Sequence, residues 1–407
     1  MPIDIRTITA DEAVAFRRAV RAGFSNADTV DDADWARDAA EPLDRVYAAF
    51  DGQSMVATLR SFPTELTVPG GSTVRAGALT AVTCHATHRR QGLLTRMITA
   101  DLTSSRDRGE SADVLIASEY SIYGRFGYGP ATETLRWEFD SSATGFATRG
   151  SGTVEFVDND TFRKEGPAIF ERVRASRPGM IGRSDVVWDM LADLRRRPED
   201  KPWQGFRVLV RDDDGTAQGW ASYKVVDEWT DLRPRSTAEV ADLCAAEPGA
   251  EARLWRFLAD LDLVTKVTAG DRPVDDVLPW LLDNARAVRT AGRADFLWVR
   301  MLDVATSLTA RSYAGAGRLV VEVVDPLGLT GGTFLLDASS DGAECSVTDE
   351  SPDLTLPVRT LGAAYLGGAR LATLHAAGWL DEHTPGSVAR ADALFAGSVA
   401  PWCNTWF

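Results

Sequence analysis

The chain has 407 residues, of which 44% are hydrophobic and 25% charged, and its formal net charge is −15 at pH 7. This length exceeds that of one ordinary domain and predicts two or three. An acidic surface repels phosphate groups, so we expect no nucleic-acid partner. We also expect no membrane partner, because no apolar run approaches the roughly 20 residues of a spanning helix.

The N-terminus and the cysteines indicate the compartment. Met1 to Asp4 contains no basic segment leading into an apolar core, so no signal peptide is visible and we expect a cytoplasmic protein. The cysteines are scattered and, like the histidines, show no metal-ligand spacing, so we expect buried or free thiols and no metal. They are Cys84, Cys244, Cys345 and Cys403.

Residues 1–140 contain the elements of a first α+β unit. Residues 3–6 are typical of a strand, and residues 11–21 of a capped helix with apolar Val14, Phe16 and Val20. Three strands are predicted next, at 45–50, 55–66 and 72–76, separated by Asp51-Gly52 and Pro69-Gly70-Gly71.

Residues 78–130 carry the most specific pattern. A strand at 78–84 is followed by a basic turn with Arg89, Arg90 and Gly92, a helix to about Ser105, and a strand at 113–118. A helix N-terminus with unpaired N–H groups can bind a pyrophosphate, arginines add donors suited to phosphate, and a glycine admits close approach. This order resembles the acetyl-CoA-binding half of a GNAT N-acetyltransferase. The last position of the usual turn pattern is Gly or Ala, and here it is Leu94.

The resemblance extends along the chain to a narrower family. Residues 87–94, 117–119 and 122–131, together with Tyr365-Leu366-Gly367-Gly368 and the terminal Phe407, resemble the Eis (enhanced intracellular survival) acetyltransferases of actinobacteria. The resemblance implies tandem GNAT domains followed by a sterol-carrier-protein-like domain. We place these at residues 1–145 (active GNAT), 146–293 (degenerate GNAT-like) and 294–407 (sterol-carrier-like, supplying the C-terminal carboxylate).

The later elements are compatible with this division. Residues 154–261 repeat the element order of the first unit, but the turn that corresponds to the basic one is Glu247-Pro248-Gly249-Ala250, which is acidic and should not bind pyrophosphate. From 297 onward the pattern predicts a strand, a helix, a four-stranded meander and closing helices. By itself, this last region indicates only another α+β domain.

Two groups are catalytic candidates. Acetyl transfer needs a proton for the departing thiolate, and the resemblance implies that Tyr123 supplies it; the plain alternative is a core aromatic residue with one hydrogen bond. It also implies that the terminal carboxylate of Phe407 is the general base. A docked apolar end is compatible with this role and also with simple anchoring, and Glu119 is the base that a reading of side chains alone would choose.

The resemblance maps the remaining contacts onto three groups of residues. Acetyl-CoA would contact the fourth strand, the basic turn and the end of the following strand, namely Val82, Thr83, Cys84, Arg89, Arg90, Gln91, Gly92, Leu93, Leu94, Thr95, Ser118 and Glu119. The acceptor would contact Asn26, Trp35 and Trp406, although relatives carry acidic residues near the first and at the last of these positions. The acidic stretch 28–41 would attract a cation or simply cap helices.

The sequence thus favours an acetyl-CoA-dependent N-acetyltransferase acting on a cationic small molecule with several amines, such as an aminoglycoside or a polyamine. The resemblance implies a homohexamer. Two alternatives remain: a carrier of hydrophobic ligands with a vestigial enzyme domain, and an acetyltransferase of protein lysines or N-termini.

Overall fold

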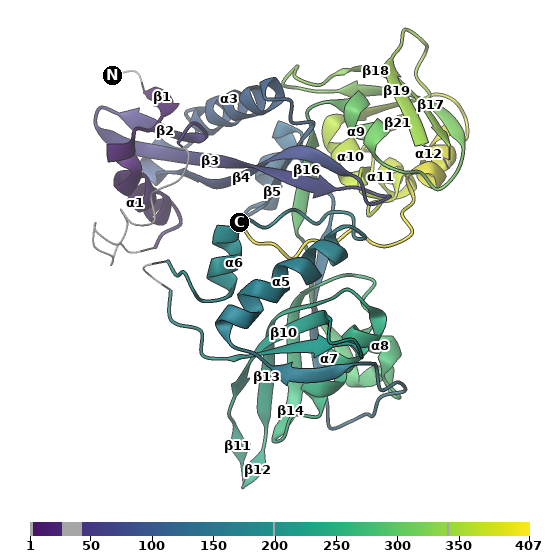
Figure 1. Cartoon of the computed structure of the whole chain (residues 1–407). Helices are drawn as coiled ribbons and strands as arrows, with labels where there is room; N and C mark the ends of the chain where they lie inside the picture. Colours follow the sequence, from purple (N-terminus) through teal and green to yellow (C-terminus); the bar gives the residue numbers. More distant parts are fainter. Residues whose placement is uncertain (1–2, 27–42, 198–199, 340–341) are drawn as a thin grey trace.

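The computed structural model describes residues 3–26, 43–197, 200–339 and 342–407 (Figure 1). Three sheets organise the chain, with the first unit at the upper left of Figure 1, the second below it and the third at the upper right. Helices and strands are mixed throughout, as the predicted α+β class requires.

The first sheet has seven strands in the order β1-β2-β3-β4-β5-β16-β6. Its chain-sequential strands β2, β3 and β4 are antiparallel, and β4 pairs in parallel with β5 across helix α3. The strands are β1 (Asp4–Thr7), β2 (Val46–Asp51), β3 (Ser54–Thr67), β4 (Thr73–Cys84), β5 (Ala112–Ile116), β6 (Gly129–Pro130) and β16 (Leu297–Met301), and the helices are α1 (Ala13–Gly23), α3 (Leu93–Asp107) and α4 (Tyr120–Tyr123).

The second sheet also has seven strands, in the order β15-β7-β14-β13-β10-β9-β8. Helices α5 and α7 both contact the β10–β13 pair. The strands are β7 (Glu133–Asp140), β8 (Thr153–Phe156), β9 (Phe206–Arg211), β10 (Ala217–Val226), β13 (Ser236–Ala245), β14 (Val264–Arg272) and β15 (Val288–Asp295), with a small hairpin of β11 (Trp229–Thr230) and β12 (Arg233–Pro234). The helices are α5 (Asn159–Arg174), α6 (Asp185–Leu191), α7 (Pro248–Ala259) and α8 (Leu278–Leu281).

The third unit is a five-stranded sheet, β19-β18-β17-β20-β21, with four helices. Its core is continuous with that of the first unit, because Leu336 and Leu356 belong to the same buried cluster as Val74 and Val114. The elements are α9 (Val304–Ala310), β17 (Gly317–Val324), β18 (Gly332–Ser339), β19 (Gly342–Val347), β20 (Leu354–Pro357), α10 (Val358–Ala364), α11 (Leu371–Ala376), β21 (Asp381–Glu382) and α12 (Ser387–Phe395).

Three details differ from the sequence-based prediction. The strands expected at 72–76 and 78–84 are one continuous strand, β4. Residues 133–140, which the sequence-based division placed in the first unit, form strand β7 of the second sheet. The strand at 297–301, expected to open the third unit, is inserted in the first sheet as β16. Two crossing strands therefore join the first two units, and the C-terminus lies between them at the centre of the molecule (Figure 1).

Candidate active site

Strands β4 and β5 separate at the point where a thioester arm would enter. Their parallel pairing covers only Ala76–Leu79 opposite Ala112–Leu115. Beyond Leu79, strand β4 continues to Cys84 paired with β3 alone, and a register shift accompanies Ala81 in a left-handed conformation with φ of 52°. β5 itself ends at Ile116, and a bulge of this kind locally bends and twists the strand that carries it. The β5 side of residues 80–84 is thereby free to offer backbone groups to a ligand.

The basic turn leads directly into helix α3. Gly92 is the N-cap residue with φ of 74°, it receives no side-chain cap, and a Cβ at this position would meet no atom within 4 Å. The first N–H groups of α3 therefore open onto free space. Arg89, Arg90 and Gln91 are exposed beside them, and Leu93 is buried beneath. This arrangement fits a pyrophosphate, since the open N–H groups directly follow two exposed arginines along the chain.

A cavity of about 700 Å³ occupies the gap between the first and second sheets. Strand β4 and the end of β5 form one wall, strands β7, β14 and β15 the opposite wall, and the chain end closes one side. Among the predicted site residues, Val82, Ser118, Tyr123, Trp406 and Phe407 line it. The structure therefore brings together residues that are separated by nearly the whole sequence.

Tyr123 lies at the end of α4, immediately after the splayed end of β5. Its side chain is 5% exposed, and its ring packs edge-on against Tyr128 with centroids 6.2 Å apart. Burial raises the pKa of Tyr123, while a side-chain hydrogen bond with Ser118 opposes that rise. The phenol thus keeps its proton at neutral pH and can donate it within the cavity.

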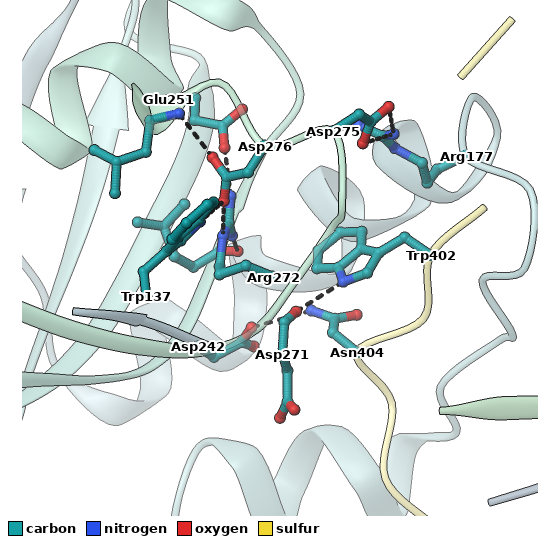
Figure 2. A network of polar contacts seen from close by, with 12 residues as sticks. Trp137, Arg177, Asp242, Glu251, Asp271, Arg272, Asp275, Asp276, Trp402 and Asn404 are labelled. Carbon is teal, nitrogen blue, oxygen red and sulfur yellow. Dashed lines mark hydrogen bonds and ion pairs between the residues drawn. The ribbon is translucent and has the colours of Figure 1, made fainter. Parts of the chain in front are cut away.

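The last residues dock as an extended segment along the second unit. Arg183 donates to the Thr405 hydroxyl at 3.0 Å and to the Asn404 carbonyl at 3.1 Å, and the Asn404 amide donates to Asp242 at 3.1 Å. Figure 2 shows this segment, including the indole of Trp402, which donates to the backbone carbonyl of Asp271 at 2.7 Å. These bonds hold the chain end in the cavity.

Phe407 completes the segment by crossing to the first unit. Its ring packs against Phe62 of β3, and Phe407 and Tyr123 both line the cavity. One candidate proton donor and one candidate proton acceptor therefore share a cavity beside the free edge of β4.

Comparison with known proteins agrees with this architecture. Family models for an acetyltransferase (GNAT) domain match residues 4–131 and 179–301, and a sterol carrier protein domain model matches residues 304–404. The N-acetyltransferase Eis of Mycobacterium tuberculosis is 35% identical over 376 residues, which cover 89% of this chain and 86% of that protein. An uncharacterised N-acetyltransferase of Streptomyces avermitilis is 42% identical and covers 100% of this chain.

The solved structure of Eis1 from Mycobacterium abscessus superposes with a TM-score of 0.87 at 32% identity, covering 99% of this chain and 100% of that one. The chain belongs to the Eis family of GNAT N-acetyltransferases. The predicted tandem GNAT domains and sterol-carrier-like domain are thereby confirmed. Acetyl-CoA is the co-substrate that membership of this family implies.

The structure of this Eis-family chain also locates the remaining predicted residues. Thr83 is buried and contacts the Thr58 hydroxyl at 2.6 Å, while Leu94 and Thr95 form the first turn of α3. Burial raises the pKa of the Cys84 thiol, with Arg89 opposing, so this cysteine stays protonated. Glu119 is exposed as the N-cap residue of α4.

The predicted acceptor contacts have three different outcomes. Trp406 lines the cavity, although its side chain is 62% exposed. Asn26 is exposed after α1, where Phe24 rather than Asn26 contributes to the lining among the described residues. Trp35 and the acidic stretch 28–41 lie outside the described residues.

The second turn, Glu247 to Ala250, is filled by the chain itself. A Cβ at Gly249 would lie 2.1 Å from the Ser151 hydroxyl, and the Ser151 amide donates to the Gly249 carbonyl at 3.0 Å. Residues 150–152 therefore pack against the first turn of α7, whereas a Cβ at Gly92 before α3 would meet no atom within 4 Å. This packing favours the prediction that the second turn does not bind pyrophosphate.

Sequence reasoning missed Asp271, on the opposite wall of the cavity. Its carboxylate accepts a hydrogen bond from the Trp406 indole at 2.7 Å. Desolvation raises its pKa, with the Trp406 hydrogen bond opposing. The only sequence signal is the preceding Gly270, which marks an irregularity in a strand.

Among the described residues, no helix is both long and apolar enough to cross a bilayer. Within the same described residues, no group of three or more His, Cys, Asp or Glu side chains is arranged to hold a metal ion.

Proposed function

We propose that this Eis-family enzyme transfers the acetyl group of acetyl-CoA to an amine of a small cationic acceptor that carries several amines, such as an aminoglycoside or a polyamine. The observation that carries the proposal is the shared cavity of Tyr123 and Phe407 at the free edge of β4. In the reaction an N–C bond forms, the thioester C–S bond breaks, one proton leaves the amine and one proton reaches the sulfur.

Each step has a candidate group in this chain. Backbone groups of residues 80–84 and the first N–H groups of α3, with Arg89 and Arg90, would hold the co-substrate. The Phe407 carboxylate would take the proton from the attacking amine, and Tyr123 would give its phenolic proton to the departing thiolate. Tyr123 belongs to the cavity wall and Phe407 to the docked chain end. Holding both groups in place would orient them toward the reacting amine and thioester.

The carrier alternative has less support. The third unit packs large aliphatic side chains into the core that it shares with the first unit, with Leu336, Leu354 and Leu366 each fully buried. That packing favours a role as a scaffold that delivers the chain end to the cavity. Acetylation of protein amines remains the second candidate, because an open cavity that admits a polyamine also admits a lysine side chain.

The deciding experiment measures thiol release from acetyl-CoA with a panel of acceptors and identifies products by mass. The panel contains a linear triamine, an aminoglycoside, a monoamine and a lysine peptide. Turnover that is fastest with the triamine or the aminoglycoside supports the proposal. Turnover with the peptide alone moves the assignment to protein acetylation, and acetyl-CoA binding with no amine turnover contradicts the proposal.

We further propose, on family membership, that the enzyme is a cytoplasmic homohexamer. Light scattering coupled to size-exclusion chromatography tests the assembly, since a hexamer of this 44.1 kDa chain differs clearly in mass from a monomer or dimer. Fractionation of cells that express the protein tests the compartment.

A further inference from the structure

Asp271 occupies an unusual backbone position on the cavity wall. It lies near the end of β14 with φ of 53°, a left-handed conformation that non-glycine residues adopt at a cost of about 1–2 kcal/mol. The pairing of β14 with β7 is interrupted between Ala269 and Arg272. The interruption takes Asp271 out of the ladder. The residue is half-buried and lines both the cavity that contains Tyr123 and a smaller one, of about 120 Å³, which Arg183 and Asp242 also line.

Two tryptophans of the docked chain end hold Asp271 in place. The Trp402 indole donates to its carbonyl and the Trp406 indole donates to Oδ2, both at 2.7 Å. In Figure 2 the Asp271 side chain points away from Trp402, so its carbonyl and its carboxylate are held from different sides. Neither indole carries a charge, and thus neither neutralises the carboxylate.

The neighbouring cation is fully used elsewhere. Arg272 is buried and donates to Asp276 at 2.7 Å and to the Leu243 carbonyl at 2.7 Å, and it pairs with Glu251 as well (Figure 2). Its guanidinium group therefore belongs to the interior of the second unit and not to the cavity.

The other charged groups of the cavity are mostly paired. Arg293 binds Glu133 through two hydrogen bonds, and Asp295 accepts from the Trp298 indole at 2.6 Å. Arg136 lines the cavity and lowers the pKa of Asp271 by its field, whereas Asp242 raises it. Among the described residues, the hydrogen-bond partner of the Asp271 carboxylate is Trp406, which leaves Oδ1 available.

We propose that Asp271 binds a protonated amine of the acceptor while a second amine of the same molecule reacts near Tyr123 and Phe407. The inference rests on the proposed function and names the group that would select for several amines. A carboxylate with one oxygen fixed by a neutral donor and the other facing a cavity is suited to accept an ammonium N–H. The second GNAT domain would thus supply a specificity-determining residue to the active site of the first.

The test compares the wild type with Asp271→Asn and Asp271→Ala. Asparagine removes the charge but still accepts the Trp406 hydrogen bond, and alanine removes both. The matched control is Asp231→Asn, at a residue that also has positive φ (49°) but lies in the β11–β12 turn, far along the second unit from the cavity. The probes are the triamine spermidine and a simple monoamine, with dissociation constants measured by calorimetry in the presence of CoA.

We expect Asp271→Asn to weaken spermidine binding and raise its KM about tenfold, as loss of a hydrogen bond to a charged group does. The monoamine affinity, the acetyl-CoA KM and kcat stay within twofold, and the spermidine effect shrinks at high salt. Asp271→Ala additionally lowers kcat. The Trp406 indole loses its hydrogen-bond acceptor, so the neighbouring Phe407, the proposed general base, is held less firmly.

The outcomes separate this inference from the proposed function. If Asp271→Asn binds spermidine as tightly as the wild type does, the inference is overturned even when turnover is normal. If the charge loss weakens spermidine binding but no amine is acetylated, the amine-binding site at Asp271 stands and the proposed function fails. If the wild type binds no spermidine, the inference is overturned whatever acceptor is turned over.

Discussion

The ring of Phe407 packs edge-on against the ring of Phe62, with centroids 5.5 Å apart and planes at 89°. Phe62 lies in β3 opposite Ala78 of β4, so the last residue of the chain contacts the sheet that forms the co-substrate wall. The contact holds the residue that carries the terminal α-carboxylate against this sheet. Any residue added after Phe407 would move that charge.

Extension of the chain by two glycines should therefore lower kcat about 100-fold, the scale of a general base. The Phe62 contact and the Trp406 hydrogen bond remain in this variant, so its thermal stability should match that of the wild type. Phe407→Leu is the matched control, because it keeps the carboxylate at the chain end and loses only part of the ring contact; its kcat should fall less than tenfold. Equal activity of the extended chain and the wild type would remove Phe407 from the mechanism.

Tyr123→Phe should lower kcat about 100-fold with little change in the KM of acetyl-CoA. The substitution removes only the phenol oxygen, and the edge-on packing against Tyr128 stays. Tyr120→Phe is the control on the same helix, because Tyr120 is 57% exposed and its ring lies against Trp298. If Tyr120→Phe lowers kcat more than Tyr123→Phe does, the proton donor is Tyr120 and not Tyr123.

The pH dependence of kcat gives a second check on Tyr123. Burial raises the pKa of this phenol, so the fall of kcat on the alkaline side should begin above the ordinary tyrosine range.

Much of the order of strands and helices could be predicted from the sequence, because it depends on short local patterns. Glycine and aspartate turns marked the hairpins, and the basic turn marked the start of α3. The sequence could not predict that β7 joins the second sheet and that β16 joins the first. The alternation of Leu135, Trp137 and Phe139 indicates a half-buried strand but not the sheet that receives it. Asp271 was missed for a related reason, because its meeting with Trp406 is created entirely by tertiary packing.

Gly92→Ala should raise the KM of acetyl-CoA severalfold and cost about 1 kcal/mol of stability, since alanine is strained at positive φ. A Cβ there enters the open space above α3 where the phosphates would lie. Gly215→Ala is the matched control: Gly215 has φ of 81° and likewise no atom within 4 Å of a built Cβ, but it belongs to the β9–β10 turn. Both variants should lose similar stability, and only Gly92→Ala should affect the KM. A similar KM change in both would attribute the effect to strain alone.

Calorimetric titration should give one acetyl-CoA per chain. Residues 150–152 pack against the first turn of α7, whereas the space around Gly92 at the start of α3 is open. Gly92→Ala should weaken this single site without revealing another. A stoichiometry of two would mean that the loop at Ser151 moves aside and that the second GNAT domain keeps a working site.

Asp101→Asn should change how stability depends on pH. Asp101 is buried in α3, its Oδ1 accepts from the Ser61 hydroxyl at 2.7 Å, and desolvation raises its pKa to about 6 from an ordinary 3.8. Because the folded state binds the proton more tightly, this group favours folding below pH 4, and the advantage is lost as the pH rises from about 4 to about 6. The free energy of unfolding of the wild type, minus that of Asp101→Asn, should therefore fall by roughly 2 kcal/mol across this range and level off above about pH 7. Asp107→Asn, an exposed site on the same helix, is the control for urea unfolding at each pH. A difference that is independent of pH would mean that Asp101 is ionised throughout and that its burial is offset by Arg45 and Arg108.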